Sequence, residues 1–206
     1  MKCILGKKIE MTQTWTETGR VVPVTVIEAG PCTVTGVRSL EKDGYEAVQL
    51  GWGAKKHLTK PMKGHLKELP AVRWLREVRC HVSGVSGAEM KRGAVIDVSM
   101  FAPGDKVKVI GVSKGKGFQG VVKRHHFHGH PPTHGHKDQE RMPGAIGAGG
   151  VQHVFKGTRM AGRMGGARVT VRGLTVVAVD KEKNRLLIKG AVPGARNGFV
   201  MIQSLA

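Results

Sequence analysis

Six histidines between residues 125 and 136 form the densest group of side chains that could carry chemistry. Imidazoles at this density can bind zinc or copper, but a functional site also needs fixed geometry, usually with a carboxylate or thiolate ligand. Only Asp138 and Glu140 are close in the chain, and neither an H-E-x-x-H nor a C-x-x-C pattern is present. Neutral histidines also exchange hydrogen bonds with RNA and stack on its bases, and we favour this role. A histidine-cluster metalloprotein acting on nucleic acid is the alternative.

The segment before the histidines matches G-x-G-x-x-G at residues 115–120. In a dinucleotide site this motif opens a helix whose N-terminal amides face the pyrophosphate. Here Val121 and Val122 lead directly into the histidines, so we expect no such helix and disfavour a nucleotide site. The segment fits a strap along an RNA backbone better, because glycines let the main chain approach phosphates that nearby cations attract. Those cations are Lys114, Lys116, Lys123 and Arg124.

Residues 141–150 and 154–166 combine Gly and Ala with Arg, Lys and Met. Such a chain can thread between RNA helices while its cations reach phosphates. Met160 and Met164 have helical spacing, but the surrounding glycines disfavour a helix. No Ser or Cys lies in a G-x-S-x-G elbow, and no carboxylate pair assigns acid and base roles to the histidines. We therefore expect no catalytic residue, no metal and no cofactor.

Charge points to the same class of partner. The 206 residues include 34 Lys and Arg against 15 Asp and Glu, a formal net charge of +19. Residues 106–179 contain thirteen Lys and Arg against two acids, a net +11, and hold half of the 30 glycines. This excess predicts a polyanion partner, most simply nucleic acid. Aromatic residues make up only 4% of the chain, which fits a protein that reads RNA shape and phosphate more than stacked bases.

Runs of β-branched residues on both sides of the basic middle predict a mainly β protein. The expected strands are 21–27, 33–37, 45–50, 107–110 and 168–171, with a hairpin formed by 174–179 and 185–188. Residues 71–78 place Val72, Leu75 and Val78 at helical spacing, which predicts a short helical segment or an irregular strap.

Together these elements predict a discontinuous β-barrel body, formed by residues 1–112 and 168–206. Residues 113–167 form a long, irregular extension loop rich in glycine and basic residues. A loop of this length buries too little apolar surface to fold alone, so it is either disordered or folded against another molecule.

Three cysteines, Cys3, Cys32 and Cys80, include no C-x-x-C pair and suit a reducing compartment. No apolar run approaches the ~18 residues of a membrane helix, and the N-terminus lacks the apolar region of a signal peptide. We expect a cytoplasmic protein with no membrane partner and no small-molecule substrate.

Residues 111–124 read GVSKGKGFQGVVKR, which closely resembles a signature of the L-three family of universal large-subunit ribosomal proteins. The resemblance continues in order along essentially the whole chain, and the bacterial form of the family fits its length. Matching strings include MTQ at 11–13, PVTVIE at 23–28, GAKK at 53–56, RMPGAIG at 141–147, VFKG at 154–157 and GAVPG at 190–194.

The resemblance implies a β-barrel body on the surface of the large subunit and a loop that reaches toward the peptidyl transferase centre. It implies binding to large-subunit ribosomal RNA, a role in nucleating assembly, neighbouring ribosomal proteins as partners, and no enzyme activity. The implied loop tip is 144–153, where Ala148, Gly149 and Gly150 replace a tip that carries a methylated glutamine in some bacteria. The candidate RNA-binding residues are Lys114, Lys116, Lys123, Arg124, His125, His126, His128, His134, Arg141, Gly144, Gly147, His153, Lys156, Arg159, Arg163 and Arg168.

We expect residues 113–167 to be cut readily by protease in the free protein and protected in the large subunit, because RNA must supply their order. Limited proteolysis of both forms, with cleavage sites identified by mass spectrometry, measures this difference. Equal protection in the two forms contradicts the prediction.

Overall fold

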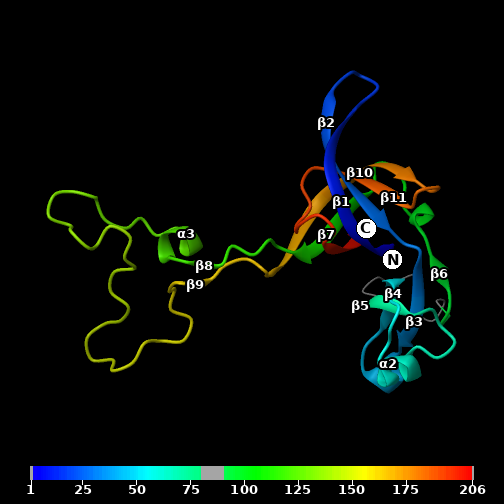
Figure 1. Cartoon of the computed structure of the whole chain (residues 1–206), viewed down its shortest axis with the longest axis horizontal. Helices are drawn as coiled ribbons and strands as arrows, with labels where there is room; N and C mark the ends of the chain where they lie inside the picture. The colour runs from blue at the N-terminus through cyan, green and yellow to red at the C-terminus, as the bar shows by residue number, and fades with distance from the viewer. Residues whose placement is uncertain (1, 80–90, 206) are drawn as a thin grey trace. The chain divides into compact units, whose positions relative to one another are not determined.

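The computed structural model describes residues 2–79 and 91–205. Strands dominate, so the expectation of a mainly β protein is confirmed (Figure 1). The chain divides into two compact units, one of Met1–Val112 with Arg168–Ala206 and the other of Ser113–Ala167. Among the described residues, the helical elements are short and are α1 (Leu40–Asp43), α2 (Lys60–His65), α3 (Val121–His125) and the 3-10 turn η2 (Val98–Met100). Among the described residues, none of the helices has the length and apolar character that crossing a membrane requires.

Six antiparallel strands of the first unit close into a barrel in the order β1-β12-β7-β10-β11-β2. The first and last strands of the chain are neighbours, with Cys3 opposite Gln203 and Lys7 opposite Phe199. Closure pairs both edges of every strand in the ring, which removes the free edges that promote aggregation. The strands are β1 (Cys3–Trp15), β2 (Val21–Ala29), β7 (Lys106–Val112), β10 (Arg168–Asp180), β11 (Arg185–Lys189) and β12 (Phe199–Ser204).

A second sheet of the same unit has the order β5-β4-β3-β6. Its strands are β3 (Cys32–Arg38), β4 (Ala47–Ala54), β5 (Val72–Arg79) and β6 (Val95–Ile96). The helix or strap expected at residues 71–78 is therefore wrong, because β5 pairs antiparallel with β4 and sets Trp74 opposite Trp52. Trp74 and Leu75 are both half-buried, so apolar side chains point to both faces of β5. Apolar residues on both faces remove the alternation of apolar and polar residues from which a strand is predicted.

The other expected strands are present, and the hairpin prediction is confirmed. Strand β10 pairs with β11 and sets Asp180 opposite Arg185. Strand β7 pairs with the first half of β10, from Val112 opposite Arg168 to Val107 opposite Leu174.

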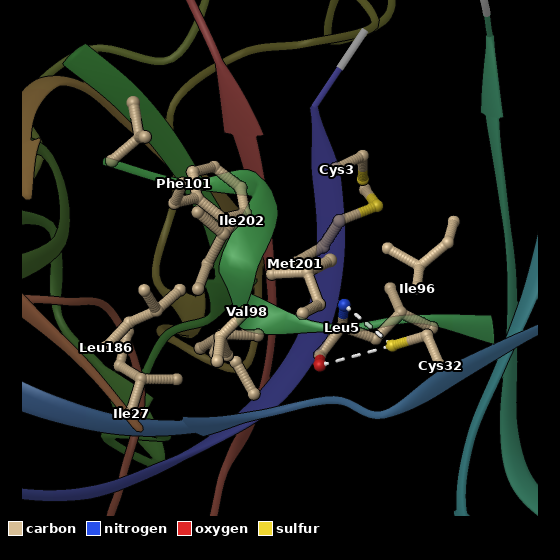
Figure 2. Packing of buried hydrophobic residues seen from close by; sticks show 14 of the residues in the cluster. Cys3, Leu5, Ile27, Cys32, Ile96, Val98, Phe101, Leu186, Met201 and Ile202 are labelled. Carbon is tan, nitrogen blue, oxygen red and sulfur yellow. Dashed lines mark hydrogen bonds between the residues drawn. The ribbon is translucent and has the colours of Figure 1, made fainter. Parts of the chain in front are cut away.

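One continuous hydrophobic core joins the barrel to the second sheet (Figure 2). Leu5, Ile27 and Ile202 are fully buried in it, and burial of each such side chain stabilises the fold by about 1.5–3 kcal/mol. The Cys32 thiol donates to the carbonyl of Leu5 at 3.6 Å and accepts from its amide at 3.4 Å. Burial raises the pKa of this thiol to about 11. Cys3 is also buried, whereas Cys80 lies outside the described residues.

We predict that Gly6→Ala lowers the free energy of unfolding by about 2 kcal/mol, because a Cβ there lies 2.5 Å from the backbone oxygen of Glu28. That oxygen belongs to the neighbouring strand of the closed ring, which limits its movement. Urea denaturation measures the change.

The matched control is Gly64→Ala in α2, where an added Cβ has no neighbour within 4 Å. This substitution is expected to stabilise the protein by about 0.5–1 kcal/mol, because it lowers the backbone entropy lost on folding. Equal urea midpoints for Gly6→Ala and the unchanged protein would show that the barrel absorbs the extra methyl group.

Candidate nucleic-acid interface

Two arms of the second unit run antiparallel and are held together by backbone hydrogen bonds. Strand β8 (Phe118–Gln119) pairs with β9 (Gly162–Arg163). Nearer the ends of the unit, the amide of Ser113 donates to Ala167 O at 2.9 Å and that of Lys116 to Met164 O at 2.9 Å. The segment thus begins and ends in two hydrogen-bonded arms, in which only the two-residue strands β8 and β9 are regular.

Strand β8 leads through Gly120 into the short helix α3. The expectation that no helix follows the G-x-G-x-x-G motif is therefore wrong. The helix has only five residues, and the strand before it pairs antiparallel with β9 instead of belonging to a parallel sheet. The arrangement lacks the parallel strands of a dinucleotide-binding fold.

Two of the predicted RNA-binding side chains fasten α3 to the returning arm. Arg124 donates from Nη1 to the carbonyl of Met160 at 2.6 Å, and His125 Nε2 lies 3.1 Å from the same oxygen. Both residues are half-buried, and Val121 beside them is buried. We conclude that part of the charge predicted to face RNA shapes the loop itself.

Residues 130–140 form a turn that carries His130, His134 and His136. The rings of His130 and His136 stack with centroids 5.3 Å apart, and the amide of His130 donates to Glu140 O at 3.0 Å. Gly129 has φ +72, and a Cβ added there would clash with the same carbonyl oxygen, so only glycine fits at this position. A cleft of about 350 Å³ brings the histidine run together with Gly144 and Arg159. Among residues 2–79 and 91–205, no three or more His, Cys, Asp or Glu side chains are grouped so as to hold a metal ion.

The cations of this unit face solvent. The four ion pairs found among the described residues all lie in the first unit, so the charges on residues 113–167 are not neutralised within the chain. Arg168 is exposed as well, but it begins β10 of the first unit. The other predicted residues that are exposed are Lys114, Lys116, Lys123, His126, His128, His134, Arg141, Gly144, Gly147, His153, Lys156, Arg159 and Arg163.

Exposed apolar side chains accompany these cations, and the sequence analysis did not include them among the candidates. Phe118 is 77% exposed and Phe155 is 58% exposed, with the ring of His153 meeting Phe155 edge-on at 5.5 Å between centroids. Met142, Ile146 and Val154 are exposed as well. A phenylalanine inside a basic segment with few acids is the signal that could have identified Phe118 and Phe155, because nucleic-acid bases stack on such rings.

Comparison with known proteins gives consistent matches. Residues 87–185 match the family model of ribosomal protein L3. The chain is 53% identical to the large ribosomal subunit protein uL3 of Herpetosiphon aurantiacus, over 98% of this chain and 96% of that protein. It is 55% identical to uL3 of Roseiflexus sp., over 97% and 95%, and 50% identical to uL3 of Acidothermus cellulolyticus, over 100% and 93%.

We predict that the untagged protein carries less than one equivalent of zinc, copper or nickel, because the described histidines and acids are not grouped so as to hold a metal ion. Elemental analysis after purification without chelating resin measures the content. Replacing His126, His128 and His130 with Ala provides the control. Stoichiometric metal that disappears in this variant would establish the alternative metalloprotein.

Proposed function

The chain belongs to the ribosomal protein L3 family, and from this premise we propose that it is a structural protein of the large ribosomal subunit that binds large-subunit ribosomal RNA. In this role it helps to nucleate subunit assembly and extends residues 113–167 toward the peptidyl transferase centre. Its partners are the RNA and neighbouring ribosomal proteins, and its location is the ribosome in the cytoplasm. The family is structural, and we propose that this chain contributes no catalytic group of its own.

The observation that carries the proposal is the surface of the second unit, which exposes apolar and cationic side chains that another molecule can contact. Val121 is its one buried hydrophobic residue among those described, while Phe118 and Phe155 stand exposed beside cations that no acid neutralises. A segment with this surface gains little by packing on itself, whereas RNA offers phosphates for the cations and bases for the rings. The interface includes the loop tip at Gly144 and Gly147 and the cleft beside His128.

The metalloprotein alternative has less support, because the histidine side chains described above do not converge on a common point. Their ring stacking and backbone contacts give the turn its shape, which a role in RNA recognition requires.

We predict that the protein sediments with large subunits at moderate salt and that its affinity for large-subunit RNA falls steeply as salt rises, because each neutralised phosphate releases counterions. Replacing Lys114 and Lys116 together with Gln is expected to lower the slope of log affinity against log salt by about 1.5.

The matched control replaces Lys181 and Lys183 with Gln, since both are exposed in the turn between β10 and β11. This pair should leave the slope unchanged. If the unchanged protein stays at the top of the gradient, the proposal is contradicted. If both double variants shift the slope equally, the placement of the interface at Lys114 and Lys116 is contradicted.

A further inference from the structure

A second cleft, of about 290 Å³, lies wholly within the first unit, where the second sheet meets the barrel. Its walls come from β5, β7, β10 and β12 and include Ile110, Val112 and Met201 as apolar surfaces. Two arginines, Arg76 and Arg168, stand at its rim and are both exposed. This volume is near the lower limit for small-ligand pockets, so the cleft suits one planar group and not a folded chain.

An aromatic cluster supports one wall of this cleft. The ring of Trp74 stacks on that of Trp52 with centroids 5.1 Å apart and on that of Phe199 with centroids 5.6 Å apart. Trp52 is buried, and its indole nitrogen donates to Gly30 O at 3.2 Å. Because the anchor is buried and hydrogen-bonded, the half-buried Phe199 ring has a fixed orientation at the cleft.

Arg76 is held in place against this cluster. Its guanidinium carbon lies 5.3 Å from the centre of the Phe199 ring, and Nη1 donates to Leu75 O at 2.8 Å. An arginine fixed in this way presents a planar cationic surface on its outer side, with further N–H groups free to point at a ligand. Its pre-organised orientation lowers the entropy lost when a ligand binds.

The one acid at the cleft, Glu77, is already engaged. It accepts from Arg38 Nε at 3.2 Å and from the Tyr45 hydroxyl at 2.9 Å. The hydrogen bond to Glu77 raises the pKa of Arg38 and that of Tyr45. The cleft therefore presents positive charge, which complements a ligand that carries a negatively charged group.

We propose that this cleft binds a single unpaired nucleotide of large-subunit ribosomal RNA. The base stacks on the outer face of the Arg76 guanidinium and contacts the apolar wall at Val112, while Arg168 reaches the phosphate. Unpaired bases that stack on arginine or aromatic planes are a usual mode of RNA recognition. The inference rests on the proposed function and adds a specific contact on the barrel body to the one on the extension.

Binding of the full-length protein to purified large-subunit RNA, measured at several salt concentrations, tests the proposal. Arg76→Lys keeps the charge and removes the planar surface, so affinity should fall about fivefold with an unchanged salt slope. Arg168→Gln should lower the slope by about 0.8, which marks a phosphate contact.

The matched control is Arg73→Lys on the same strand, where the guanidinium carbon lies 4.4 Å from the Trp74 ring and Arg73 does not line the cleft. This variant should bind as the unchanged protein does. Equal affinities for Arg76→Lys and Arg73→Lys overturn the proposal while leaving the proposed function intact. An unchanged protein that fails to bind the RNA overturns both.

A second measurement does not depend on how the variants fold. Ultraviolet irradiation of intact large subunits, followed by mass spectrometry, should join a nucleotide to the peptide that contains Phe199 and Met201. If that peptide is cross-linked by protein-reactive reagents to an acidic segment of another protein and never to a nucleotide, the cleft is a protein site and the proposal is wrong.

Discussion

The antiparallel pairing of β7 with β10 is the interaction on which the rest of the molecule depends. It closes one side of the six-stranded ring, and its outermost register pair sets Val112 opposite Arg168. Adjacent strands are about 5 Å apart, so the pairing also fixes the two ends from which residues 113–167 depart. The pairing of the two strands offsets the loop-closure entropy of that long segment. The segment therefore needs to bury little apolar surface of its own.

The two units differ in which side chains they bury and which they expose. The first unit gathers nearly all of the buried hydrophobic residues and all four ion pairs described, and it holds its aromatic rings in fixed contacts such as Trp52 against Trp74. In the second unit cations and phenylalanine rings are exposed, and the internal hydrogen bonds hold the backbone in its conformation. Most of the buried contacts and most of the exposed cations therefore lie in different units, which explains the uneven distribution of charge along the chain.

Local pattern was enough to predict β2, β3, β7, β11, both halves of β10 and the first part of β4, because β-branched runs there end at turn residues. It failed for β1, where Lys7 and Lys8 interrupt the apolar pattern. The structure accounts for both, since Lys7 pairs with Glu28 at 3.1 Å and Lys8 donates to Val192 O at 2.8 Å. Partners so distant in the chain leave no local signal. Strand β5 was expected to be a short helix or an irregular strap, because apolar side chains on both of its faces hide the alternation of a strand.

For the interface, composition predicted that most cations of residues 113–167 face outward, because a segment with only two acids, Asp138 and Glu140, cannot neutralise them all. Composition did not predict that Arg124 and His125 turn inward to Met160 O, since that contact joins residues more than thirty positions apart. The exposed rings at Phe118 and Phe155 were also missed. Single residues in a loop have no periodicity, so the basic surroundings of these rings were the one signal in the sequence, and the structure shows that the rings are exposed.

The pairing of β1 with β12 has a consequence for the order of events during synthesis. These strands are the first and the last to be made, and each needs the other to complete the ring. The barrel therefore cannot close while its final residues are still being added. The basic segment is made before β10, β11 and β12, so it leaves the translating ribosome while the ring that anchors both of its ends is still incomplete.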